Sequence, residues 1–287
     1  MNKLIFQLLV GLLFLCFVNY ANAGLTVIGA INKVENSIGG RVGVSILHKT
    51  SGQLWSYNGD VRFPLMSTFK TFACGALLFK SQNKELSLDQ SVLLTRDALL
   101  AYSPVTKNYI NKRISLEQAC SAAMLTSDNT AANIVLKTLG GPTKVTEFMR
   151  LLGDETTRLN RIEPNLNTAL KNDVRDTTTP NAAAKSLRNL LFVGATLSKK
   201  NRSQLLFWMQ ENRVSDDLLR SVLPENWRIA DRSGAGDFGS RAINALVWTE
   251  AGESFVVSIY LTQTHGTMHE LNQAIALIGK AIFEQYR

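Results

Sequence analysis

The sequence predicts a two-lobed α+β fold with an α/β lobe: an antiparallel sheet built from both chain ends and flanked by helices, plus an inserted all-helical lobe. Three observations predict this architecture. Strand patterns occur near the start and again near the end of the chain, helical periodicity fills most of the sequence between them, and an amphipathic segment ends the chain. We place the α/β lobe at about 24–60 and 210–287, and the helical lobe at about 61–209.

The predicted strands fall into two groups. Residues 41–49 (RVGVSILHK) alternate and are rich in β-branched side chains, and the turn-forming letters SGQ separate them from LWSYN, which predicts a β-hairpin. Three more strands are predicted at 227–232, 241–250 and 254–262. Antiparallel strands from the two groups fit one shared sheet.

The predicted helices lie mostly between these groups. Apolar residues three and four apart predict helices at 67–80, 115–126, 130–139, 142–153 and 182–190, and residues 268–287 predict a C-terminal amphipathic helix. A polar segment at 156–179 shows little periodicity, and long segments of this kind in compact domains usually carry function. A cleft between the two lobes is the expected place for a site.

Residues 1–23 have the features of a signal peptide. One lysine supplies a positive start, residues 4–18 are almost wholly apolar, and ANA at 21–23 is a small-x-small cleavage pattern. A membrane anchor would need an apolar run of ~20 residues, and a lipoprotein signal around Cys16 would need a small residue before that cysteine. We therefore expect a periplasmic single catalytic domain at 24–287 that has no membrane partner after cleavage.

Charge and composition limit the classes of partner that the protein can bind. The formal net charge is +8, but the basic residues are scattered, and the densest cluster, SKKNR at 198–202, has no interleaved aromatic residue. The sequence therefore favours a solvated helix end at this place over a nucleic-acid surface. His48, His265 and His269 lie outside the motifs described below, and we expect no metal, no cofactor and a monomeric protein that acts on a small molecule.

Signal cleavage would leave two cysteines, Cys74 and Cys120. Two cysteines in an exported chain suggest one disulfide, and two buried thiols are the alternative. Ser67 and Lys70, in PLMSTFK, also have two interpretations. The serine either caps a helix, or it is a nucleophile whose proton passes to an amine one helical turn further on. A serine three residues before a lysine also occurs at Ser81 and Lys84, so the pair alone does not decide between a cap and a nucleophile.

Two further motifs join or end predicted elements. Ser127-Asp128-Asn129 lies between two predicted helices and suits either a helix cap or a hydroxyl relay at Ser127 beside an amide-binding Asn129. Arg232-Ser233-Gly234 follows a predicted strand. It suits either a glycine-rich hairpin turn or a carboxylate site where glycine lets a ligand approach the backbone.

The fourth motif, RIEPNLN, lies in the polar segment. Glu163 is either an exposed loop acid or a base that activates a water with the help of Asn167, and its peptide bond to Pro164 is a candidate for the cis form.

In order and spacing, these four elements resemble the class A serine β-lactamases, whose signature is S-x-x-K, S-D-N and K-T-G. The resemblance covers essentially the whole mature chain, including Cys74 and Cys120. One position departs from it, because Arg232 stands where lysine is usual, which resembles the carbenicillin-hydrolysing branch. Arginine keeps the positive charge and adds a planar fork of donors, so the change bears on the substrate profile.

The resemblance implies a serine acyl-enzyme mechanism. Ser67 would attack the lactam carbonyl, Lys70 or a water held by Glu163 would take its proton, Ser127 would protonate the lactam nitrogen, and Glu163 would activate the hydrolytic water. The backbone N–H groups of Ser67 and Ala235 would form the oxyanion hole. The residues implied in substrate binding are Tyr102, Asn129, Asn167, Arg232, Ser233, Gly234, Ala235 and Arg241, and Arg161 and Asp176 would pair across the loop that carries Glu163.

Two rival functions share parts of this pattern. A cell-wall transpeptidase or carboxypeptidase has the serine, lysine and cationic motifs but stays acylated by penicillin, and the carboxylate at Glu163 argues against it. A penicillin-sensing receptor domain would need a membrane anchor and a cytoplasmic partner domain, which the sequence does not predict.

Overall fold

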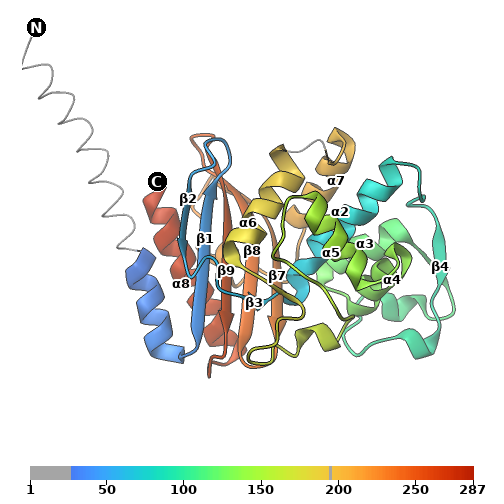
Figure 1. Cartoon of the computed structure of the whole chain (residues 1–287), viewed down its shortest axis with the longest axis horizontal. Helices are drawn as coiled ribbons and strands as arrows, with labels where there is room; N and C mark the ends of the chain where they lie inside the picture. Colours follow the sequence, from blue (N-terminus) through green and yellow to red (C-terminus); the bar gives the residue numbers. More distant parts are fainter. Residues whose placement is uncertain (1–26, 194–195) are drawn as a thin grey trace, which may run out of the picture.

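The computed structural model describes residues 27–193 and 196–287, so the predicted signal peptide at 1–23 lies outside the described residues. A five-stranded antiparallel sheet, ordered β2-β1-β9-β8-β7, forms one lobe (Figure 1). Its strands are β1 (Arg41–His48), β2 (Leu54–Tyr57), β7 (Arg228–Gly236), β8 (Ser240–Trp248) and β9 (Ser254–Thr262). Because β1 pairs with β9 along its whole length, the sheet joins both ends of the chain, as predicted.

Two terminal helices cover one face of this sheet (Figure 1). They are the helix at 27–38 and α8 (Met268–Gln285), whose capping box at Thr267 and Glu270 satisfies the first backbone donors. Alternate side chains of β1, such as Val44 and Ile46, pack against their apolar face, because successive residues of a strand point to opposite sides. This layer is the first of two large cores.

The second core lies in the helical lobe on the other side of the sheet (Figure 1). Cys74 and Cys120 form a disulfide there with a Cα–Cα distance of 5.7 Å, which confirms the predicted bridge over two separate thiols. The helices are α2 (Phe69–Gln82), α3 (Leu116–Thr126), α4 (Asn129–Leu139), α5 (Pro142–Leu151) and α7 (Lys199–Gln210), while α6 (Pro180–Arg188) packs on β1 and β9.

Short elements complete the described chain. Two-stranded pairs are formed by β3 (Phe63–Pro64) with β6 (Thr177–Thr178), and by β4 (Ser91–Leu93) with β5 (Arg113–Ser115). Single turns of helix occur at Met66–Thr68, Arg96–Ala98, Thr106–Tyr109, Asn165–Asn167, Asn189–Val193 and Leu219–Val222. The β3–β6 pair ties the end of the polar segment 156–179, hereafter the Glu163 loop, to the chain just before Ser67.

The structure also departs from the sequence prediction. The helix at 27–38 was not predicted, and of α7 the sequence indicated only a solvated helix end at 198–202, because the first half of α7, KKNRSQ, is too polar to show an apolar period. Strand β7 runs on to Gly236, beyond the predicted end at 232, so the interpretation of Arg232-Ser233-Gly234 as a turn is wrong. Within the described ranges, no helix is both long enough and apolar enough to cross a bilayer.

Candidate active site

Ser67 lies in the helical turn directly before α2 and is almost fully buried. Its side chain caps neither this turn nor α2, so the structure gives no support to the capping interpretation. Met66, the residue before it, has a φ of +49°, a backbone conformation that costs free energy for a residue with a side chain and that clusters at functional sites. Strand β7 packs tightly here: a Cβ atom on Gly234 would lie 2.8 Å from the Ser67 backbone nitrogen.

Lys70 connects Ser67 to the second motif. Its Nζ donates hydrogen bonds to Ser127 O (2.9 Å), Ser127 Oγ (3.1 Å) and Asn129 Oδ1 (2.8 Å). Ser127 Oγ in turn donates to Ser67 Oγ over 3.0 Å. Ser127 ends α3 in the left-handed conformation with φ +61°, which turns its carbonyl and hydroxyl toward the lysine. The neighbouring Asp128 does cap α4, so the structural interpretation holds for that residue.

The Lys70 ammonium also meets the carboxylate of Glu163. Nζ lies 3.0 Å from Glu163 Oε1, and both side chains are fully buried. Burial lowers the pKa of Lys70 to about 8, because the charged form loses its hydration, while the charge of Glu163 partly opposes this shift. The amide of Asn167 donates to Glu163 Oε2 over 2.6 Å. Glu163 Oε1 and Asn167 Oδ1 are buried oxygens that receive no hydrogen bond from any described residue.

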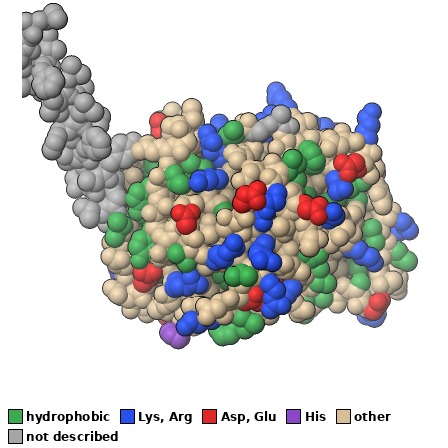
Figure 2. Space-filling view, viewed as in Figure 1, with side chains coloured by type: hydrophobic (Ala, Val, Ile, Leu, Met, Phe, Trp, Pro, Cys, Tyr) green, Lys and Arg blue, Asp and Glu red, His purple; other side chains and the backbone are tan. Residues whose placement is uncertain are grey.

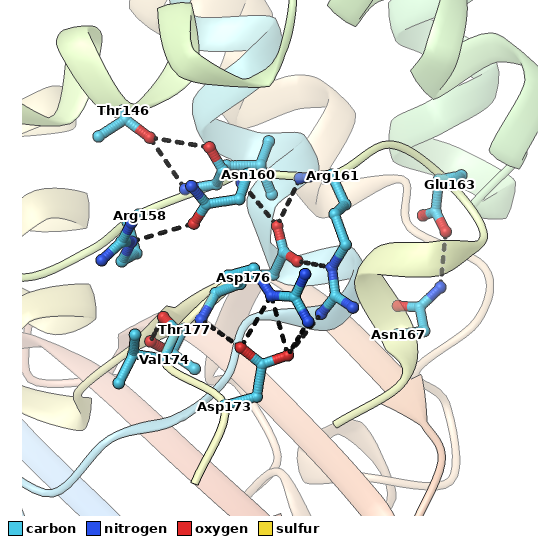
Figure 3. Close-up of polar contacts among 12 residues, drawn as sticks. Thr146, Arg158, Asn160, Arg161, Glu163, Asn167, Asp173, Val174, Asp176 and Thr177 are labelled. Carbon is cyan, nitrogen blue, oxygen red and sulfur yellow. Dashed lines mark hydrogen bonds and ion pairs between the residues drawn. The ribbon is translucent and has the colours of Figure 1, made fainter. Parts of the chain in front are cut away.

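The Glu163 loop is held from several sides. Arg161 Nε lies 2.5 Å from Asp176 Oδ2, which confirms the predicted ion pair (Figure 3). Asn133 holds the Glu163 backbone twice, by donating to its carbonyl (2.9 Å) and by accepting from its N–H (3.0 Å). The Glu163–Pro164 peptide bond is cis, the form that the sequence had suggested.

Arg232 is placed differently from the prediction. Its side chain is fully buried beside the nucleophile and does not line the cavity of the site. The guanidinium donates to Ser67 O (3.3 Å), Met124 O (3.4 Å) and Asn212 Oδ1 (3.3 Å), and its Nη2 has no hydrogen-bond partner among the described residues. Burial lowers its pKa to about 10. Direct contact between Arg232 and a substrate carboxylate is therefore not the role that this geometry favours.

The cavity in front of Ser67 has a volume of about 250 Å³. Arg241 lines it and is held by Asn272 Oδ1 (2.9 Å) and Gly234 O (3.1 Å), and burial lowers its pKa to about 10. The remaining lining residues are Ser67, Tyr102, Ser127, Asn129, Asn167, Val214, Ser233, Gly234 and Ala235. Of the predicted site residues, only Lys70, Glu163 and Arg232 are absent from the lining, because they lie buried behind it.

Several residues of the site were missed by the sequence analysis. Val214 lines the cavity, Asn133 holds the Glu163 backbone, Asn212 contacts Arg232, and Asn272 orients Arg241. None of them belongs to a short motif, and their roles come from neighbours that are distant in sequence. Across 27–193 and 196–287, no cluster of three His, Cys, Asp or Glu side chains is arranged to hold a metal ion.

A buried serine that is hydrogen-bonded through a second serine to a lysine–glutamate pair defines a serine hydrolase that works through an acyl-enzyme. Residues 27–286 match the sequence model of the family described as "Beta-lactamase enzyme family". The protein belongs to this family and is a class A serine β-lactamase.

Individual relatives and solved structures support the same family assignment. The chain is 50% identical to β-lactamase CARB-4 of Pseudomonas aeruginosa over 253 residues, 88% of each chain, and 50% identical to β-lactamase PSE-4 of the same organism over 256 residues, 89% of this chain and 88% of that one. The crystal structure of the chromosome-encoded β-lactamase of Vibrio parahaemolyticus is similar with a TM-score of 0.88 and 45% identity, covering 91% of this chain and 99% of that chain.

Proposed function

We propose that the protein hydrolyses the β-lactam amide bond of penicillins, carbenicillin included, through an acyl-enzyme on Ser67 that a water activated by Glu163 releases. Such hydrolysis confers resistance to these antibiotics. The observation that carries the proposal is the continuous line of contacts from Ser67 Oγ through Ser127 Oγ to Lys70 Nζ and the Glu163 carboxylate. Each of these groups holds or passes a proton in the reaction.

In acylation, Ser67 Oγ bonds to the lactam carbonyl carbon and gives up its proton. Two routes are open to that proton: through Ser127 Oγ to a neutral Lys70, or through a water to Glu163. Both routes leave it on the Lys70–Glu163 pair, whose charged atoms are 3.0 Å apart. As the carbon–nitrogen bond breaks, Ser127 Oγ protonates the departing nitrogen and is reprotonated by Lys70, from which it accepts a hydrogen bond.

In deacylation, a water must be held beside Glu163 and attack the ester. Glu163 Oε1 and Asn167 Oδ1 are buried oxygens that accept no hydrogen bond from any described residue, and a water can donate one hydrogen bond to each of them. Glu163 accepts a proton from this water as the oxygen attacks the ester carbon, and Ser67 Oγ takes a proton when it leaves. The hydroxyl of Ser67 and the empty cavity are then restored.

A hydroxyl and a guanidinium would bind the ring carboxylate of the drug, with a buried positive charge behind them. Ser233 and Arg241 line the cavity and reach a ligand directly. Arg232 lies behind them and acts without touching the ligand. It donates a hydrogen bond to the Ser67 carbonyl and keeps a fixed positive charge beneath the site. Carbenicillin, with its second carboxylate, fits a cleft of this charge, and the chain is 50% identical to the CARB-4 and PSE-4 enzymes.

The setting of this activity is part of the same proposal. The predicted signal peptide and the disulfide suit an exported enzyme of the periplasm, where disulfides persist. We propose that it works there as a monomer, without metal or cofactor.

The trapped acyl-enzyme tests the proposal. We expect Glu163→Ala, incubated with benzylpenicillin, to accumulate a penicilloyl adduct, which mass spectrometry locates on the peptide that contains Ser67. The wild-type protein should turn over without such an adduct, and Ser67→Ala should form none. Benzylpenicillin and carbenicillin should both be hydrolysed efficiently by the wild-type enzyme. A wild-type protein that is acylated once and stays acylated would instead identify a transpeptidase or a receptor.

A further inference from the structure

A second cavity, of about 320 Å³, is lined largely by the Glu163 loop and shares no lining residue with the cavity in front of Ser67, and we call it the rear cavity. It is enclosed by the start of β1, the residues around β3, the end of β9 and the loop from Arg161 to Thr177. Figure 2 shows Lys and Arg side chains gathered on the lower middle of this face, where Figure 1 places β3 and the adjoining loop. The catalytic mechanism uses none of its charged groups directly.

The lining of the rear cavity carries an excess of positive charge. Its five cations are Arg41, Arg62, Arg161, Lys171 and Arg175, and its two carboxylates are Asp173 and Asp176, which leaves a formal excess of three positive charges.

Both carboxylates are already paired. Arg175 donates to Asp173 from Nε (3.0 Å) and from Nη2 (2.8 Å), and Arg161 lies between Asp173 and Asp176 (Figure 3). They are therefore not available to the other three cations.

Those three cations, Arg41, Arg62 and Lys171, contact no carboxylate in the part of the chain that the structure describes. The two arginines are held in place by neutral groups. Arg41 stacks 5.0 Å above the ring of Phe63 and donates to the Arg62 carbonyl, while Arg62 donates to Thr156 O (2.9 Å) and Thr177 Oγ1 (3.0 Å). Both are partly buried, and lost hydration lowers the pKa of each.

We propose that the rear cavity binds a phosphate group. A phosphate dianion supplies the charge and the several acceptor oxygens that two fixed guanidinium groups and a lysine require, and planar guanidinium groups bind phosphate through paired hydrogen bonds. The volume of about 320 Å³ admits the phosphate and the first atoms of a molecule attached to it. Leu170 and Val174, each 47% exposed, supply an apolar rim for such an attachment. Free phosphate and the phosphomonoester of a lipid headgroup share this chemistry.

A bound phosphate would connect two parts of the molecule. Arg41 and Arg62 belong to the sheet side, and Lys171 belongs to the Glu163 loop. The ligand would therefore restrain the loop from behind, close to Asn167, without touching the cavity in front of Ser67. This gives a signal other than catalysis: hydrogen exchange of the loop should slow when the ligand binds.

Isothermal titration with inorganic phosphate tests the proposal at constant ionic strength, with chloride as the comparison anion. We expect saturable binding of phosphate, weakened about tenfold in Arg41→Gln, which corresponds to about 1.4 kcal/mol. Lys171→Gln, at an exposed side chain, should leave folding intact and weaken phosphate binding by about threefold. Lys200→Gln, an exposed lysine in the first turn of α7, is the matched control and should bind as the wild type does.

Two further measurements complete the test. Phosphate should slow deuterium uptake of the peptide covering 168–176 in the wild type and not in Arg41→Gln. Vesicles of phosphatidylcholine with or without phosphatidic acid identify the source: retention on the acidic vesicles beyond the effect of free phosphate assigns a lipid headgroup, and equal retention on both assigns free phosphate. Absence of phosphate binding and of phosphatidic acid binding, or binding that Arg41→Gln and Lys171→Gln leave unchanged, would overturn the proposal, whatever the result for penicillin hydrolysis.

Discussion

Glu163 and Asp176 are buried carboxylates of the same loop, and each faces a cation. Asp176 is saturated: besides Arg161 Nε, it accepts the backbone N–H groups of Asn160 (2.6 Å) and Arg161 (2.9 Å). Among the described residues, the Asn167 amide donates the hydrogen bond to the Glu163 carboxylate, and Glu163 Oε1 forms an ion pair with Lys70 Nζ at 3.0 Å.

The difference separates a structural ion pair from a reactive one. A carboxylate of which both oxygens accept hydrogen bonds, which we call saturated, holds two chain segments together. A buried carboxylate that pairs with a lysine whose pKa is lowered to about 8 is costly to the fold and can exchange a proton with that lysine. The loop thus contains one pair that positions it and one pair that reacts.

The largest effect should come from Glu163→Gln, which keeps the shape of the side chain and removes its basicity. We expect kcat for benzylpenicillin to fall by about 10³, within the range for a general base. The matched comparison is Asp176→Asn, which changes the saturated pair in the same way. Equal losses of kcat in the two variants would show that the pairs do not differ in role.

The same variant sharpens the assignment of the acylation base. In Glu163→Gln only Lys70 remains to accept the Ser67 proton, and the pKa of Lys70 should fall below its value of about 8, because the stabilising charge of Glu163 is gone. The neutral fraction of Lys70 grows as pH rises through that pKa, so the single-turnover acylation rate should rise with pH, with a midpoint below pH 8, and level off above that midpoint. A flat profile between pH 5 and 9 would exclude Lys70 as the acceptor.

Arg232 gives the next largest effect, because it is a cation without a saturating carboxylate contact of its own. We expect Arg232→Ala to lower kcat/KM for benzylpenicillin and carbenicillin by more than about 10²-fold, and Arg232→Lys to stay within about tenfold, or 1.4 kcal/mol. Thermal melting of both variants separates this loss from unfolding, since the side chain is fully buried. Full activity of Arg232→Ala on both drugs would show that Arg232 does not contribute to turnover.

Asp176→Asn should act mainly on stability. It leaves Arg161 without its main partner, and breaking a buried pair costs about 3–5 kcal/mol, a value reduced here because Arg161 is 20% exposed. We expect the free energy of unfolding to fall by about 2 kcal/mol, and kcat by no more than about tenfold. Denaturant titration measures the first quantity and steady-state kinetics the second. Unchanged stability would show that the saturated pair is not what holds the loop.

The smallest effect on turnover should come from the disulfide. Cys74→Ala/Cys120→Ala opens a loop of 46 residues, which in the chain-entropy model costs roughly 4 kcal/mol and lowers the melting temperature by roughly 10 °C. Room-temperature kcat should stay within about twofold, because neither sulfur contacts a reacting group. A loss of activity without a loss of stability would contradict this separation of roles.

The sequence by itself determined the chemistry to a large extent. Four short motifs, taken together and in order, indicated Ser67, Lys70, Ser127 and Glu163 through their resemblance to the class A signature. Alternation and helical periodicity placed most strands and helices, because a period is carried by neighbouring residues. Of the helix at Lys199–Gln210 the sequence indicated only a solvated end, since its polar first half has no apolar period to detect.

Only the tertiary structure decided how these residues meet. Lys70 and Glu163 are distant in sequence, and their 3.0 Å contact exists because the β3–β6 pair and Asn133 carry the loop back over α2. Arg232 belongs to a motif in which the sequence predicted a carboxylate-binding cation, yet the packing of β7 against Met66–Thr68 buries it behind the site. Burial and the pKa shifts that it causes depend on which distant segments exclude water, and no local pattern carries that information.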